Sequence, residues 1–368
     1  MRGKIRHIYP GGNTPKGFFS YYQYILGQEE ANRIICLKGG PGVGKSTFMK
    51  KIGEHFIERE EDVDFLWCSS DPGSLDGIVL KKRKIAIIDA TSPHMVDPIN
   101  PGAVDSIVHL GDFWNGEALK KCKDHVLESS RKIKNWFGYA YCYLAAAGEL
   151  YGALSNAYDD AVEDGELYKI TAGIVGDEMA HKEIALKPGQ LKKQFASAIT
   201  PAGVQHRLES IIRGYDKLYM LTGPVGLSNS RLLNIVAESA LYRGMDVEAF
   251  YCPMKPDEKI EHLLIPQLGV AFVSLNQYHD LEPWEREEEV KLIDMNDIVD
   301  WSRLEELRPM LADSERRMGE MIEEGIRCIV RAKKEHDHLE SYYIPNMDFK
   351  KIDGLRDEII GKIEKNVL

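Results

Sequence analysis

A glycine-rich segment at residues 39–47 carries the residue types that phosphate binding requires. Gly39, Gly44, Lys45 and Ser46 occupy the fixed positions of the pattern G-x-x-x-x-G-K-[ST]. Glycines let backbone amides curl around a phosphate, Lys45 places a cation against the β- and γ-phosphates, and Ser46 offers its hydroxyl to Mg²⁺. The predicted nucleotide-binding residues are Gly39, Gly40, Pro41, Gly42, Val43, Gly44, Lys45, Ser46 and Thr47.

The elements on either side of this loop must position it, and the sequence predicts both. Residues 33–38 (Arg-Ile-Ile-Cys-Leu-Lys) form an apolar run that is typical of a buried parallel strand. Residues 46–59 predict a helix, because Phe48, Ile52 and Phe56 recur every four residues on one face. The N-terminus of such a helix adds the positive end of its dipole to the phosphate site.

A second apolar strand ends in a carboxylate that predicts a metal ligand. Residues 84–89 read Lys-Ile-Ala-Ile-Ile-Asp, and we expect Asp89 to hold Mg²⁺ together with Ser46. The next residue is Ala90, where ATPases of the ABC and AAA types carry a catalytic glutamate. This difference favours a kinase-like or switch-like site. We expect Lys45 and Asp89 to act in catalysis.

Asp71 is the third predicted catalytic residue. It lies in the segment Cys-Ser-Ser-Asp-Pro-Gly at residues 68–73, which leaves a strand at the edge where ligands bind in open α/β folds. There a carboxylate can accept the proton of an acceptor hydroxyl or orient a water molecule. The sequence Asp-Pro-Gly is equally typical of a tight turn, so both interpretations stand.

An internal duplication sets the domain organisation. At an offset of 184 positions, residues 37–46 align with residues 221–230, and the apolar strand at 64–68 aligns with 248–252. Within each half, short apolar strands alternate with helices. We therefore predict an α/β fold of two tandem parallel-sheet domains of the P-loop NTPase type, each followed by a helical segment. The predicted domains are 1–190, with the intact loop, and 191–368, with a degenerate loop.

The second half has lost the residues that the chemistry needs. Asn229 replaces the lysine, Ser228 replaces the second glycine and Ser274 replaces the aspartate. Without a cation for the γ-phosphate or a carboxylate for Mg²⁺, this half is not expected to hydrolyse nucleotide. We interpret it as a scaffold, with a regulatory nucleotide site as the alternative. Arg231, beside the degenerate loop, suggests an arginine finger that reaches the first site in an intramolecular pseudo-dimer.

Both halves also keep a histidine after the strand that ends in Asp89 or Ser274. His94 lies in Pro-His-Met-Val-Asp-Pro, and His279 lies in Tyr-His-Asp-Leu-Glu-Pro. Because His279 persists where the catalytic groups are gone, bracing of a loop is the better interpretation of the pair.

The composition restricts the class of partner and the compartment. The chain has 368 residues and a net charge of −11, which argues against a nucleic acid as the main partner. No apolar run reaches the roughly 20 residues of a membrane helix, and no signal-peptide region is visible, so we expect a cytoplasmic protein with no membrane partner. The six cysteines include no C-x-x-C pair and predict no zinc site.

These motifs resemble those of known proteins. The first half resembles P-loop nucleoside triphosphatases. The layout of nearly the whole chain resembles a bacterial family of tandem-duplicated P-loop ATPase or nucleotide-kinase-like proteins, through the segments at residues 39–47, 71–77, 93–98, 101–105 and 110–114. The resemblance implies ATP binding and does not indicate the biological role, whereas Mg²⁺ is predicted from Ser46 and Asp89.

The leading interpretation is a Mg²⁺-dependent ATP-binding protein that hydrolyses ATP at one active site in the first half. One alternative is a nucleotide or small-molecule kinase, in which Asp71 activates the hydroxyl of an unknown acceptor. Another is an ATP-gated binding protein with negligible turnover and a protein partner. The preference for ATP over GTP depends only on the lack of an Asn-Lys-x-Asp guanine-reading motif.

Overall fold

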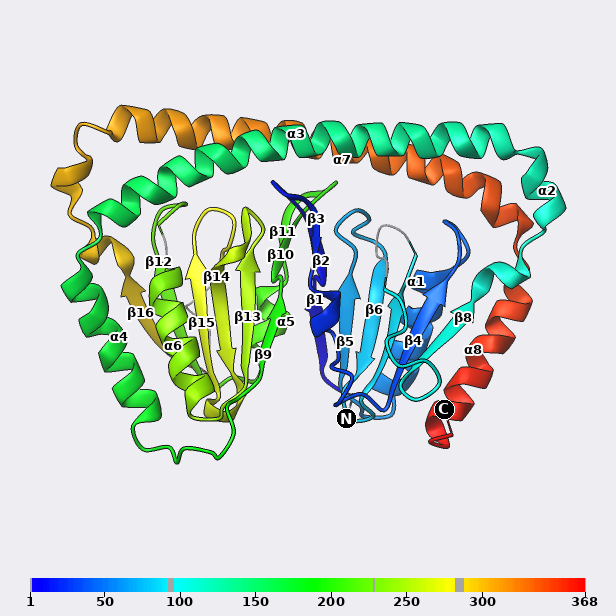
Figure 1. Ribbon diagram of the computed structural model, residues 1–368, viewed down its shortest axis with the longest axis horizontal. Helices are drawn as coiled ribbons and strands as arrows, with labels where there is room; N and C mark the ends of the chain where they lie inside the picture. Colours follow the sequence, from blue (N-terminus) through cyan, green and yellow to red (C-terminus); the bar gives the residue numbers. More distant parts are fainter. Residues whose placement is uncertain (1, 92–95, 228, 282–287, 368) are drawn as a thin grey trace.

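The computed structural model describes residues 2–91, 96–227, 229–281 and 288–367. Two six-stranded sheets stand side by side, and two long helices run above both of them (Figure 1). Helices also cover the outer sides of the sheets, so the molecule is a mixed α/β structure.

The first sheet has the strand order β1-β5-β6-β7-β4-β8. Neighbouring strands are parallel except at β6, which runs antiparallel to both β5 and β7. Only residues 68–74 connect β5 to β6, and a parallel crossover needs a dozen residues or more. The prediction of a wholly parallel sheet is therefore wrong at this strand. The strands are β1 (Ile5–Ile8), β4 (Arg33–Lys38), β5 (Val63–Trp67), β6 (Leu75–Leu80), β7 (Ile85–Asp89) and β8 (Asp105–His109).

The second sheet repeats this topology, with the order β9-β13-β14-β15-β12-β16. Its one antiparallel strand is β14, which follows β13 after the two residues 253–254. The duplication read from the sequence thus extends to strand order and direction. The strands are β9 (Leu191–Gln194), β12 (Lys217–Thr222), β13 (Val247–Cys252), β14 (Lys255–Ile265), β15 (Val270–Leu275) and β16 (Glu289–Asp294).

A four-stranded antiparallel sheet joins the two halves. Its central strands are β2 and β10, where Asn13 faces Ile199 and the Asn13 side-chain amide donates to the Ile199 carbonyl at 2.9 Å. Nearby, Tyr9 bridges Phe195. Both pairs are 186 positions apart in the sequence, so a pseudo-two-fold axis passes between β2 and β10. The strands are β2 (Gly11–Thr14), β3 (Gly17–Ser20), β10 (Ser197–Thr200) and β11 (Gly203–His206).

The long helices α3 and α7 lie antiparallel across the top of both sheets (Figure 1). The 39 residues of α3 span about 58 Å, which is long enough to connect the two halves. The helices are α1 (Lys45–Ile57), α2 (Gly116–Lys121), α3 (Lys123–Ala161), α4 (Asp164–Met179), α5 (Leu208–Ile212), α6 (Ser230–Tyr242), α7 (Arg308–Tyr343) and α8 (Phe349–Glu364). Short 3₁₀ helices are η1 (Tyr22–Tyr24), η2 (Leu110–Phe113), η3 (Pro266–Leu268), η4 (Met295–Ile298), η5 (Trp301–Leu304) and η6 (Ile344–Asn346).

The two helical segments cross over between the halves. Helix α4, from the first half, packs on α6 of the second half, whereas α8, from the second half, packs on α1 of the first. Ile359 and Ile363 of α8 belong to the same core as Ile52 of α1, and Leu167 and Ile174 of α4 belong to the core of the second sheet. Each of the ranges 1–190 and 191–368 therefore contains one six-stranded sheet, and a helix from the other range completes its core.

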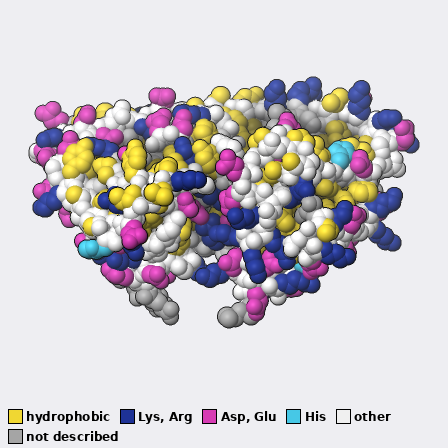
Figure 2. Space-filling model, turned by 60° about the horizontal axis from the view of Figure 1, so that its bottom comes forward, with side chains coloured by type: hydrophobic (Ala, Val, Ile, Leu, Met, Phe, Trp, Pro, Cys, Tyr) yellow, Lys and Arg dark blue, Asp and Glu magenta, His cyan; other side chains and the backbone are white. Residues whose placement is uncertain are grey.

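No described helix is long and apolar enough to cross a bilayer. On the face shown in Figure 2, basic and acidic side chains are interspersed over both halves, without a continuous stripe of lysine and arginine.

Candidate functional site

The glycine-rich loop (residues 39–47) lies between β4 and α1, where the periodicity of the sequence places it. Phe48, Ile52 and Phe56 are all buried on the core face of α1. Gly42 and Gly44 adopt left-handed backbone angles with φ of 66° and 86°, which a residue with a side chain rarely adopts. No side chain among the described residues caps the N-terminus of α1 and its first turn holds no acidic residue, so its amides remain available to an anion.

Lys45 and Asp89 meet beside this loop. The Lys45 ammonium donates to the carbonyl oxygens of Gly39 and Gly40, at 3.0 and 2.8 Å, and lies 3.6 Å from a carboxylate oxygen of Asp89. The strands that carry these residues pair in parallel, so their carboxyl ends share one edge of the sheet. The other Asp89 oxygen accepts the Thr91 amide at 2.9 Å, which fixes the orientation of the carboxylate.

Ser46 and Thr91 tie the loop to its neighbours. The Ser46 hydroxyl oxygen accepts the Leu75 amide at 3.0 Å, where β6 begins. The Thr91 hydroxyl donates to the Gly39 carbonyl at 2.9 Å. Sequence reasoning missed Thr91, although its place two residues after Asp89 is a usable signal. Oxygen atoms of Ser46 and Asp89 are the donor type that Mg²⁺ prefers, and both residues border the loop.

Asp71 is engaged in its own turn. One carboxylate oxygen accepts the Ser74 hydroxyl at 2.7 Å, and the other accepts the Gly73 amide at 3.2 Å. The Lys333 ammonium of α7 also lies 3.4 Å from Asp71. These contacts match the interpretation of Asp-Pro-Gly as a turn, and the catalytic role of Asp71 stays a prediction.

The C-terminal end of α7 covers the glycine-rich loop, and no motif in the sequence indicates this. The Gly42 amide donates to a carboxylate oxygen of Glu340 at 3.0 Å. The Tyr343 ring lies against Gly40, and Ile344 of η6 lies against Gly42. A carboxylate therefore takes a loop amide of the kind that binds phosphate oxygens, and apolar side chains cover the adjoining glycines.

Charged groups of α7 extend this cover toward Asp71. Lys333 pairs with both Asp71 and Asp337. Burial of the ammonium lowers the pKa of Lys333, but the hydrogen bond to Asp337 and the charge of Asp71 outweigh it and raise the pKa overall. Burial lowers the pKa of His336, whose Nδ1 atom has no hydrogen-bond partner among the described residues. These groups come from the second half of the chain.

The degenerate loop (residues 223–230) is closed by packing. The Asn229 side chain donates to the Ser274 hydroxyl at 2.9 Å, so a neutral pair stands in the places of Lys45 and Asp89. Helix α3 contacts the loop directly, because the Ser155 hydroxyl donates to the Gly226 carbonyl at 2.8 Å. Ser228 lies outside the described residues. The described part of this loop has no cation that could replace Lys45.

The arginine-finger hypothesis is wrong for this structure. Arg231 pairs with Asp164 of α4 at 2.7 Å and lies over the Tyr168 ring, on the half that does not carry the glycine-rich loop. His94 lies outside the described residues. His279 is buried and its Nε2 atom is 2.9 Å from the Ser197 hydroxyl, a contact that braces the loop after β15.

The chain was also compared with known proteins. No family model, no curated protein and no solved structure matches it.

Proposed function

We propose that the first half binds Mg·ATP and hydrolyses it slowly. The observation that carries this proposal is the position of Lys45, 3.6 Å from Asp89, beside a loop whose left-handed glycines open onto the N-terminus of α1. A cation, a carboxylate and helix-terminal amides around one loop are the parts that phosphoryl transfer uses.

Each residue has a role in this proposal. Lys45, now bonded to the Gly39 and Gly40 carbonyls, exchanges these neutral partners for the β- and γ-phosphates. Ser46 and Asp89 would hold Mg²⁺, which neutralises developing charge on the phosphates. Ala90 follows Asp89, so no carboxylate stands where many ATPases place their base, and slow turnover follows.

The first test is release of ADP from Mg·ATP by the wild type and by Lys45→Ala, with and without pooled nucleosides, nucleotides and sugars. We expect a low rate that Lys45→Ala abolishes and that the pools leave unchanged. Lys51→Ala is the matched control, because Lys51 lies on α1 but pairs with Asp353 at the surface. A rate that rises with one pool would instead make the protein a kinase. A rate equal in the wild type and Lys45→Ala would remove the proposal.

A nucleotide-gated switch is the second candidate, and one contact favours it. Because Glu340 occupies the Gly42 amide, a phosphate and the Glu340 carboxylate compete for the same side of the loop. The Tyr343 and Ile344 side chains also lie against Gly40 and Gly42, so we expect them to shift when a nucleotide binds. We infer that nucleotide binding displaces the C-terminal end of α7. This helix packs along α3, and its N-terminal end lies over the second half (Figure 1).

Hydrogen exchange measures this displacement. Amides at residues 333–349 should exchange faster when a non-hydrolysable ATP analogue is bound, whereas amides in the middle of α7 should not change. Slower exchange of the amides at residues 333–349 when the analogue is bound would contradict the switch. It would not contradict ATP binding by the first half.

A further inference from the structure

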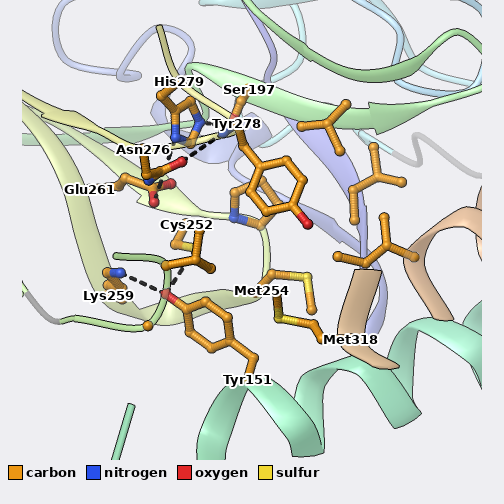
Figure 3. A pocket seen from close by; sticks show the side chains of 16 residues that line it. Tyr151, Ser197, Cys252, Met254, Lys259, Glu261, Asn276, Tyr278, His279 and Met318 are labelled. Carbon is orange, nitrogen blue, oxygen red and sulfur yellow. Dashed lines mark hydrogen bonds and ion pairs between the residues drawn. The ribbon is translucent and has the colours of Figure 1, made fainter. Parts of the chain in front are cut away.

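The second half contains a cavity at the same edge of its sheet that carries the nucleotide site in the first half. The cavity measures about 40 Å³, more than the roughly 10–15 Å³ that one water molecule occupies. Figure 3 shows Glu261, Lys259 and His279 on one side of it, and Met254 and Met318 on the other. The polar side chains come from β14 and from the loop after β15.

Two buried side chains, Glu261 and His279, line this cavity, and a third, His262, lies close to them. Glu261, His262 and His279 are 3%, 2% and 4% exposed. One potential ligand atom from each lies within 4.8 Å of the other two. Imidazole nitrogen with carboxylate oxygen is a donor set that suits zinc and other first-row divalent ions, whereas Mg²⁺ and Ca²⁺ prefer oxygen alone.

Several of their polar atoms have no partner among the described residues. These atoms are Glu261 Oε2, His262 Nε2 and His279 Nδ1. The opposite ring nitrogens are anchored, because the Ser274 amide donates to His262 Nδ1 at 3.2 Å and the Ser197 hydroxyl lies 2.9 Å from His279 Nε2. An unsatisfied buried polar atom costs about 1–3 kcal/mol, so each of the three atoms calls for a partner.

The carboxylate of Glu261 favours an ion over a water molecule as its partner. No lysine or arginine nitrogen lies within 4.0 Å of the Glu261 carboxylate in the described part of the chain, and His279 is 3.8 Å away. Lys259 is turned toward the Tyr151 hydroxyl at 2.6 Å (Figure 3). A water molecule satisfies hydrogen bonds but does not balance a buried charge, and buried charges in proteins are paired or bind metals.

Comparison with the first half shows that the cluster is a specific replacement. The pairing of β6 with β7 matches the pairing of β14 with β15. In this match, Asp76 and Gly77 of β6 take the positions of Glu261 and His262 of β14. Asp76 accepts the Tyr22 hydroxyl at 2.8 Å, whereas Leu208 stands in the place of Tyr22 in the second half. The second half has therefore lost a hydroxyl donor and gained an imidazole at this point, which a scaffold alone does not require.

We propose that the second half binds one divalent transition-metal ion through Glu261 Oε2 and His279 Nδ1. His262 acts as a positioning residue. Because its Nδ1 atom accepts the Ser274 amide, the neutral ring carries its proton on Nε2 and donates to a water molecule bound to the ion. The cavity has room for such water ligands. This inference does not depend on nucleotide binding by the first half.

The test is titration of metal-free full-length protein with Co²⁺, followed by its absorption spectrum and by elemental analysis, with Zn²⁺ and Mg²⁺ in parallel. We expect one Co²⁺ or Zn²⁺ per chain, no comparable uptake of Mg²⁺, and the same result in Lys45→Ala. Glu261→Gln and His279→Ala should abolish saturable binding, and His262→Ala should weaken it about 10- to 100-fold.

Two controls keep the outcome interpretable. His336→Ala should bind the ion normally, although His336, Asp337 and Glu340 form another group with potential ligand atoms. The melting temperature of each metal-free variant reports folding, and Zn²⁺ should raise it in the wild type but not in the nearly isosteric Glu261→Gln. A wild type that binds no ion, equal binding by Glu261→Gln, or loss of binding in His336→Ala would each overturn the proposal.

Discussion

Removal of the Glu340 carboxylate should increase the affinity of the first half for nucleotide. In the structure, this carboxylate accepts the Gly42 amide at 3.0 Å. The contact stabilises the closed loop, and under the proposed function a bound phosphate replaces it. Any free energy that this contact adds to the closed state is subtracted from the apparent binding free energy of the nucleotide.

The expected size follows from the type of contact. A hydrogen bond to a charged group contributes about 1.5–3 kcal/mol, and we take about 1–2 kcal/mol here because the Glu340 side chain is 29% exposed and partly screened by solvent. Since about 1.4 kcal/mol is a factor of ten, Glu340→Ala should bind nucleotide about 5- to 30-fold more tightly. The nucleotide affinity of Glu340→Gln should lie between those of the wild type and Glu340→Ala, because glutamine keeps a neutral hydrogen-bond acceptor.

Equilibrium titration with a fluorescent ATP analogue in Mg²⁺ measures this change. Glu324→Gln is the matched control, because Glu324 lies on the same helix and pairs with Arg327 at 2.8 Å, away from the loop. The reasoning is refuted if Glu340→Ala binds no more tightly than the wild type while Glu324→Gln behaves normally. Weaker binding by Glu340→Ala would mean that Glu340 supports the bound state.

Further predictions concern stability and the second half. Arg6 pairs with Asp64 of β5 and Glu248 of β13, each at 2.9 Å, so Arg6→Ala should lower the free energy of unfolding in urea by about 3–5 kcal/mol. Burial raises the pKa of both carboxyl groups, but the charge of Arg6 outweighs it and lowers both pKa values. This stabilisation should be complete above about pH 4.5 and be lost as pH falls through the lowered pKa values. Between neutral and acidic pH, the free energy of unfolding should therefore fall less in Arg6→Ala than in the wild type. Asn229→Lys combined with Ser274→Asp should not create a second nucleotide site in an equilibrium titration, because α3 still packs on the degenerate loop.

Local features were predictable from the sequence because local chemistry determines them. The four-residue spacing of Phe48, Ile52 and Phe56 predicted α1, and the apolar run at residues 33–38 is β4. The last residue of β7 is Asp89, as its strand pattern indicated. The duplication was also visible, because the two loops keep enough common residues to align.

Long-range features were not predictable, because they depend on contacts between distant segments. The direction of β6 follows from a short connection whose ends a single sequence does not reveal. The exchange of α4 and α8 between the halves depends on which sheet each apolar face meets. Glu340 looks like any other acidic residue of a charged helix, and only the path of α7 brings it to Gly42, 298 positions away in the sequence.

The stoichiometry of Mg·ATP binding, measured by isothermal titration calorimetry, tests the central claim most directly. The account predicts one nucleotide per chain in the wild type and in Asn229→Ala, and none in Lys45→Ala. Two nucleotides per chain, or unchanged binding in Lys45→Ala, would contradict the assignment of the site to the glycine-rich loop of the first half.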